Sequence, residues 1–126
     1  MAHDTDVSHE DLLKAVIGHQ KKSLSEDIDV NDFLPHLYQA RVIERATEDK
    51  IRARLKTEGE TGAASLFWSM VLRDEIPVLR FLEVMRKEEH WICDKLEQGV
   101  PKVKSGEWPL HGEPDLKSRL MYYFSH

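Results

Sequence analysis

Two residues with metal-binding or nucleophilic chemistry, His90 and Cys93, lie three positions apart in the sequence. On a helix this spacing places both side chains on one face, where they could share a zinc ion. A zinc site needs three or four protein ligands, and no further pair of such residues lies nearby in the sequence. Glu89 and Asp94 flank the cysteine, and negative neighbours raise a thiol pKa rather than lower it. We therefore interpret His90 as a surface residue and Cys93 as a partly buried thiol.

Other catalytic motifs are absent from the sequence. It contains no glycine-rich phosphate loop, no His-Glu-x-x-His pair of metal ligands and no nucleophile elbow around a serine. The 23 acidic residues make carboxylate pairs common by chance, so we interpret most of these pairs as a solvated helix surface. We predict neither enzymatic activity nor a cofactor.

The composition restricts the class of protein further. The 126 residues carry a net charge of −5 and 40% of them are hydrophobic, which suits a single soluble domain with a core. The acidic pI of about 5.8 argues against nucleic-acid binding. One cysteine excludes an internal disulfide, and no apolar run approaches the roughly 18 residues of a membrane helix. The polar N-terminus is unlike a signal peptide, so we expect a cytoplasmic protein without membrane contact.

The hydrophobic spacing predicts helices throughout residues 8–98 and no strand. Ser8 is expected to cap a first helix that bends near Gly18, because glycine weakens a helix interior. Asn31 or Asp32 is expected to cap the second helix, because a proline at position 35 belongs in a first turn. The later helices are expected to follow Thr47, Thr61, Asp74 and Glu89, with a loop over 56–62 and a stop at Gly99. These six helices predict an all-α, compact antiparallel bundle.

Proline and glycine become denser towards the C-terminus, which predicts a helical domain over residues 8–100 and a Pro/Gly-rich tail over residues 101–126. The spacing of apolar residues favours a short helix over 115–124 within that tail. Aromatic side chains on the inner faces of the predicted helices are expected to form the core. They are Phe33, Phe67, Trp68, Phe81 and Trp91.

Charge is distributed along the chain in blocks, from which we predict two interaction patches. The basic patch comprises Lys14, Lys21, Lys22, Arg52, Arg54 and Lys56. The acidic patch comprises Glu26, Asp27, Asp29, Asp32, Glu48 and Asp49. A small domain with separate positive and negative faces can bind copies of itself head to tail, and a contact of this kind that does not close produces a filament. The alternative is that the charges only keep the protein soluble.

Four segments, in order and almost without gaps, resemble the caspase recruitment domain of the death-fold superfamily. They are residues 24–37 at the passage between the first two helices, residues 41–51 at the entry into the third, residues 78–85 in the fifth and residues 96–101 at the close of the domain. The resemblance covers about residues 10–103 and is closest to adaptors of the apoptosome type.

This resemblance implies a non-catalytic six-helix bundle that binds other such domains or itself, and that recruits caspases or signalling adaptors in apoptosis or innate immunity. In the family, a basic patch on helices one and four meets an acidic patch on helices two and three. Lys21, with Lys22 beside it, and Glu48 occupy matching positions here. Pro35 and Glu60 depart from the family's charge pattern, so the charge pairs are expected to be redrawn. The alternatives are a decoy that caps such assemblies and an unrelated small helical bundle that binds a ligand.

Overall fold

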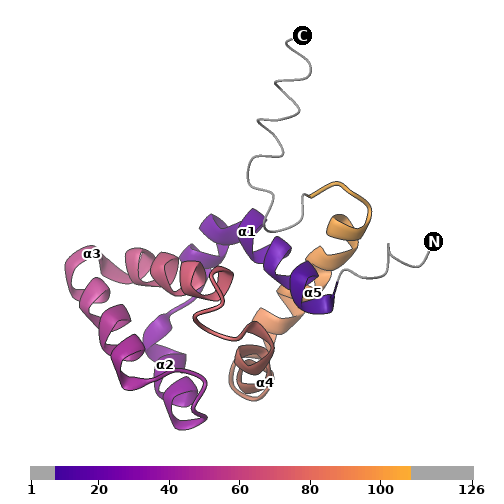
Figure 1. The fold of residues 1–126 in the computed structure, drawn as a ribbon. Helices are drawn as coiled ribbons and strands as arrows, with labels where there is room; N and C mark the ends of the chain where they lie inside the picture. The colour runs from indigo at the N-terminus through magenta and orange to yellow at the C-terminus, as the bar shows by residue number, and fades with distance from the viewer. Residues whose placement is uncertain (1–7, 109–126) are drawn as a thin grey trace.

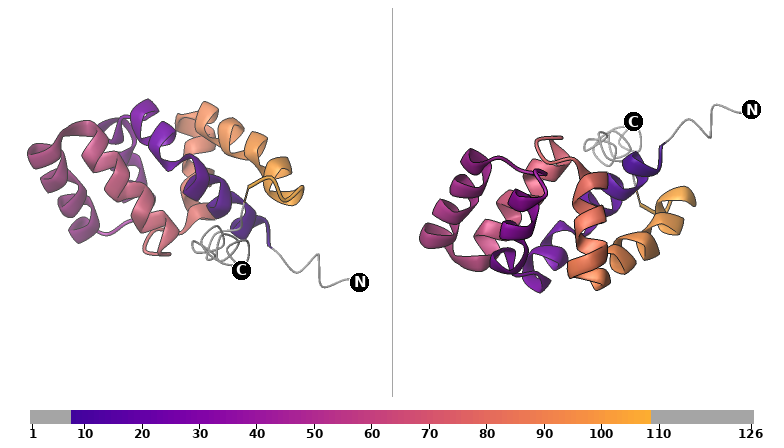
Figure 2. Two further views of the ribbon diagram at one scale, coloured as in Figure 1. Left: turned by 90° about the horizontal axis from the view of Figure 1, so that it is seen from above. Right: turned by 90° about the horizontal axis from the view of Figure 1, so that it is seen from below.

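Five helices make up the computed structural model, which describes residues 8–108. They are α1 (His9–Asp27), α2 (Val30–Gln39), α3 (Arg45–Leu72), α4 (Val78–Glu88) and α5 (His90–Lys104). No strand occurs within this part of the chain, which confirms the all-α prediction. α1 lies between α3 and α5 in both views of Figure 2, while α2 and α4 complete the bundle on the lower side in Figure 1.

Two helices begin with side-chain caps. Ser8 caps α1 as predicted, since its hydroxyl accepts a hydrogen bond from the Asp11 N–H at 3.1 Å. α2 begins earlier than predicted, because the Asp29 carboxylate accepts the N–H of Asn31 at 2.9 Å and satisfies the first turn there. The prediction that Asn31 or its neighbour caps α2 is therefore wrong, and Pro35 lies inside the helix rather than in its first turn.

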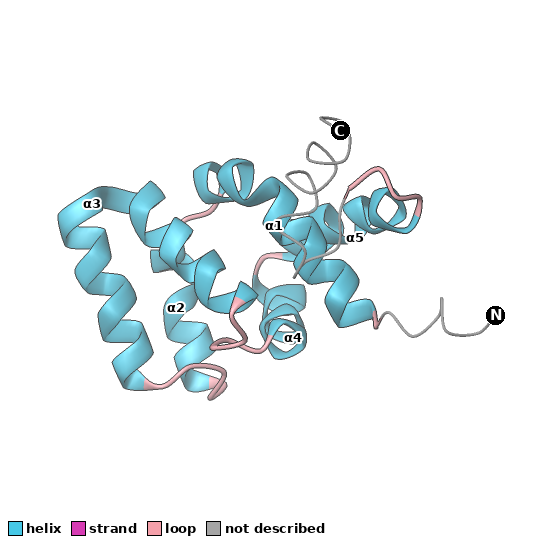
Figure 3. Cartoon of the chain, turned by 45° about the horizontal axis from the view of Figure 1, so that its top comes forward, coloured by secondary structure: helices cyan, strands magenta, loops and turns pink. Residues whose placement is uncertain are grey.

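Two helices carry bends. α1 leaves helical geometry at Gln20, where φ is −108° and ψ is 17°, two residues beyond the bend predicted at Gly18. α3 changes direction at Gly59, whose φ of +80° and ψ of −175° are readily adopted only by glycine (Figure 3). The predicted loop over 56–62 is wrong, because this single residue turns the chain. The predicted third and fourth helices are the two segments of α3. The bundle therefore has five helices where six were expected.

α5 passes through its predicted stop. It continues beyond Gly99 and Pro101, so the expected start of the tail falls inside this helix. Gly99 is buried, and a Cβ atom built on it would lie 2.6 Å from Val16 and 2.9 Å from Trp108. The glycine therefore admits the close approach of α1 to α5 rather than ending the helix. The helix predicted over 115–124 lies outside the described residues.

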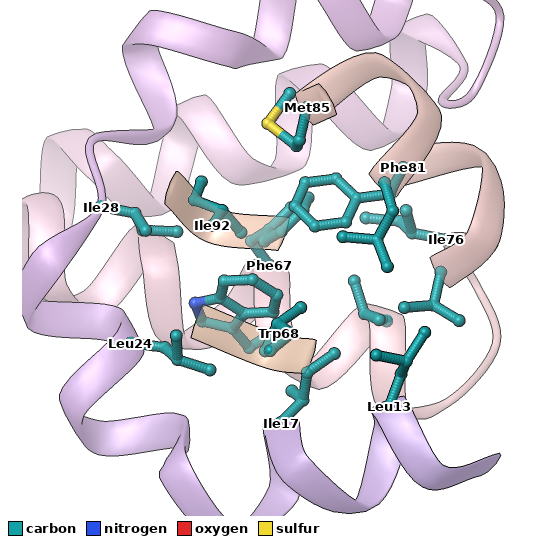
Figure 4. Close-up of a cluster of buried hydrophobic side chains, with 14 of the residues drawn as sticks. Leu13, Ile17, Leu24, Ile28, Phe67, Trp68, Ile76, Phe81, Met85 and Ile92 are labelled. Carbon is teal, nitrogen blue, oxygen red and sulfur yellow. The ribbon is translucent and has the colours of Figure 1, made fainter. Parts of the chain in front are cut away.

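A cluster of aromatic rings fills the centre of the bundle (Figure 4). The centroid of the Phe67 ring lies 5.1 Å from the centroids of Phe33, Trp68 and Phe81, in edge-to-face or tilted arrangements. All four side chains are at most 1% exposed, which confirms that they form the core. The prediction for Trp91 is wrong: it is 39% exposed, because it lies in the first turn of α5 and the next residue along takes the buried position.

Candidate interaction surface

One residue of the predicted basic patch does not lie at the surface. The Lys14 side chain is 8% exposed, and its Nζ donates a hydrogen bond to Asp74 Oδ1 at 2.5 Å. Asp74 lies between α3 and α4 with a φ of +64°, a conformation that aspartate tolerates better than most residues. Lys14 therefore ties α1 to the α3–α4 turn, and this ion pair removes its charge from the predicted patch.

The other two predicted lysines of α1 follow its bend. The Lys21 Nζ donates a hydrogen bond to Ser69 Oγ at 2.5 Å, which joins α1 to the second segment of α3. Lys22 is exposed and has no carboxylate of residues 8–108 within ion-pair distance. We call these two lysines the basic surface. The basic surface lies on α1, beside the second segment of α3. These two elements correspond to the predicted first and fourth helices.

The predicted basic residues of α3 alternate with acidic ones. Arg52 Nη2 lies 3.1 Å from Glu48 Oε2, and Arg54 Nε lies 3.3 Å from Glu58 Oε2. Both pairs are four residues apart, a spacing that brings side chains together on a helix. Arg52 and Glu48 were predicted for opposite patches, yet they neutralise each other here. Lys56 is exposed. The predicted separation of charge does not hold on this first segment of α3.

The predicted acidic residues at the junction of α1 and α2 have different surroundings. Asp27 Oδ2 lies 2.7 Å from the Nζ of Lys95 on α5, and Asp29 caps α2. Glu26 and Asp32 are exposed, and neither has a cationic partner among residues 8–108. Two of the four carboxylates therefore stabilise the fold, and two remain free at the surface.

A side-chain contact brings the acidic start of α2 next to α3. Arg52 Nη1 donates a hydrogen bond to Asn31 Oδ1 at 3.3 Å, so Asp32 lies beside the helix segment that carries Glu48 and Asp49. We call Asp32 and Asp49 the acidic surface; Glu48 is left out of it, because its side chain is only 14% exposed and is paired with Arg52. The sequence did not predict the Arg52–Asn31 contact that assembles this surface. The two residues are 21 positions apart, and no pattern of neighbouring residues indicates that they meet.

The candidate metal-binding or nucleophilic residues do not form a site. His90 Nδ1 lies 3.0 Å from Asp94 Oδ2 at the surface. Cys93 is 5% exposed, and its thiol donates to the Leu82 carbonyl oxygen at 3.5 Å. Burial raises the pKa of the Cys93 thiol, which keeps it protonated. Within residues 8–108, no three histidine, cysteine or acidic side chains come together as potential metal ligands.

Within residues 8–108 the chain is a small helical bundle with charged residues at its surface and a buried, protonated thiol. The family model described as the caspase recruitment domain matches residues 9–99. The chain therefore belongs to the caspase recruitment domain family, whose members are non-catalytic modules for homotypic protein–protein interaction. No curated protein and no solved structure matches the chain significantly. None of the helices within the described residues is long and apolar enough to cross a membrane.

Proposed function

We propose that this domain assembles with copies of itself and with like domains through its basic surface and its acidic surface. The observation that carries the proposal is a pair of contacts. The Lys21–Ser69 hydrogen bond joins α1, which carries the basic surface, to the second segment of α3. The Arg52–Asn31 hydrogen bond joins the start of α2, which carries Asp32, to the first segment of α3, which carries Asp49. These two contacts support a proposal in which the basic and acidic surfaces belong to different helix pairs of one domain.

Surfaces of opposite charge on different helix pairs favour a head-to-tail contact between copies. Such a contact leaves one surface of each kind unused at the ends of the assembly, so it propagates into a filament unless the rotation closes a ring. Each exposed charge pair contributes about 0–1 kcal/mol, so these charges act mainly on the association rate and on the choice of partner. Salt should weaken the assembly, because exposed charges are screened.

The cellular role that we propose is recruitment of caspases or signalling adaptors in apoptosis or innate immunity, in the cytoplasm. Membership in the caspase recruitment domain family supports the mode of binding. The similarity of residues 96–101 to the close of the domain in adaptors of the apoptosome type supports the adaptor role.

Two reversed charges test the proposed contact. Lys22→Glu alters only the basic surface, and Asp32→Lys alters only the acidic surface. Each variant alone should assemble about fivefold more weakly than the wild type, which corresponds to roughly 1 kcal/mol. In an equimolar mixture, each variant supplies the surface that the other has lost, so mixed assemblies should form. Size-exclusion chromatography with light scattering, at low and high salt, measures both effects.

Lys104→Glu is the matched control, because it makes the same charge change at an exposed position of α5 outside both surfaces. Asp32 lies in the first turn of α2, where a reversal costs about 0.3–1 kcal/mol, so thermal unfolding must confirm that this variant is folded. A mixture that assembles no better than its components, or a control that weakens assembly equally, refutes the charge assignment. A wild-type protein that stays monomeric at every concentration refutes self-assembly and favours the capping decoy.

A further inference from the structure

A hollow of about 280 Å³ lies at the seam between α1 and α5, on residues that the two charged surfaces do not include. The bend of α1 supplies one wall, and successive turns of α5 supply the floor. Its lining residues are Gln20, Lys95, Gln98, Gly99, Lys102 and Trp108. The hollow is smaller than a typical pocket for a drug-sized ligand, which measures about 300–1,000 Å³, so it suits a single side chain or a small ion.

The polar side chains that line this hollow are two amides and two amines. Gln20 and Gln98 provide amide N–H donors, and Lys95 and Lys102 provide ammonium groups. No carboxylate is among the lining residues, although Asp27 holds the Lys95 Nζ at 2.7 Å. Lys102 is exposed and has no carboxylate of residues 8–108 within ion-pair distance. The hollow therefore has a positive charge that no acidic side chain of the described chain neutralises.

Trp108 forms the aromatic wall of the hollow, and several contacts hold it in place. Gly106, with a φ of +85°, turns the chain back after α5, and the Trp108 N–H donates to the Lys102 carbonyl oxygen at 3.1 Å. The Trp108 ring stacks on His19 with centroids 4.2 Å apart, and the Lys102 Nζ lies 5.0 Å from its centroid. The indole is 8% exposed. The wall and one ammonium group are therefore positioned before any ligand arrives.

We propose that this hollow is a binding site for a carboxylate side chain of an acidic peptide segment. Lys102 would pair with the carboxylate, and the amides of Gln20 and Gln98 would donate hydrogen bonds to it. The site is separate from the proposed self-assembly, because neither the basic surface nor the acidic surface lines it.

The test follows the indole N–H signal of Trp108 and the side-chain amide signals of Gln98 in ¹⁵N–¹H spectra. A hexaglutamate peptide is added as the probe, and free glutamate and inorganic phosphate are added in separate titrations. The peptide should shift both signals saturably. Lys102→Gln should weaken binding about fivefold, whereas Lys104→Gln, the same charge change two residues away and outside the lining, should leave it nearly unchanged.

Two further variants keep the test independent of the Lys102–Trp108 contact. Gln98→Glu places a carboxylate in the hollow and removes the amide signal at position 98, so it is read from Trp108 alone and should abolish the shift of that signal, whereas Gln39→Glu on α2 should not. Asp27→Asn releases Lys95 and should tighten binding several-fold more than Glu97→Gln, which removes an equal charge paired with His9.

The absence of a saturable shift would overturn the proposal. Equal effects of Lys102→Gln and Lys104→Gln would overturn it as well, because they would show diffuse attraction by net charge. Tighter binding of phosphate than of the peptide would overturn the assignment to a peptide carboxylate. The Lys22→Glu variant should bind the probe as the wild type does, so failure of the self-assembly proposal leaves this result intact.

Discussion

Gly99→Ala tests the close approach of α1 to α5. An added Cβ atom would lie 2.6 Å and 3.0 Å from the two γ carbons of Val16, and 2.9 Å from the indole of Trp108. Ordinary contacts between carbon atoms begin near 3.4 Å, so both neighbours would have to move by several tenths of an ångström. Both of them are buried, which leaves little room for that movement.

Two effects of opposite sign determine how much Gly99→Ala changes the free energy of unfolding. Adding a methyl group to a packed core costs about 1–3 kcal/mol. Alanine is intrinsically better than glycine inside a helix by about 1 kcal/mol. The packing cost exceeds the helical gain, so Gly99→Ala should lower the free energy of unfolding by about 1 kcal/mol. For a domain of this size, that change lowers the Tm by about 4–8 °C.

Urea unfolding followed by circular dichroism measures the change, and a double-mutant cycle identifies its cause. Val16→Ala removes two of the three close contacts of the new methyl group and leaves the one with Trp108, so the cost of Gly99→Ala should fall, without disappearing, in that background. The coupling energy should therefore be favourable and smaller than about 1 kcal/mol. A Gly99→Ala variant at least as stable as the wild type would refute the packing explanation, and strictly additive effects of the two substitutions would refute the role of Val16.

Three more predictions follow from contacts within the described residues. Asp74→Asn keeps a residue that tolerates a positive φ but removes the charge that faces buried Lys14, so it should lower the free energy of unfolding by about 1 kcal/mol at low salt; an unchanged urea midpoint would contradict the role of this ion pair. Burial raises the pKa of Cys93 above the ordinary thiol value of 9.0, so its alkylation by iodoacetamide in the native protein should be slow at pH 8 and should accelerate only at more alkaline pH. Because the unfolded thiol ionises first as the pH rises, this cysteine should also make the protein less stable above about pH 9, an effect that Cys93→Ala should remove.

Features set by neighbours in the sequence were predicted well. The helical class follows from hydrophobic spacing, and the Ser8 cap follows from a bond between residues three positions apart. The errors concern residues with an ambiguous local meaning. Gly99 and Pro101 are a standard stop signal, yet α5 continues through them, because tertiary packing against α1 outweighs the weak local preference. Gly59, by contrast, turns α3 without the loop that was predicted around it.

The sequence by itself determined an all-α domain of the caspase recruitment family, because helical periodicity and the order of local strings are properties of the chain. Only the tertiary structure decided which charges remain free. Lys14 meets Asp74 across 60 positions, and Asp27 meets Lys95 across 68. A charged group loses its effect on a partner when an opposite charge lies within about 4 Å, and that distance depends on how helices far apart in the sequence pack together. The exposed Lys22 and Asp32 became candidates for binding for the same reason.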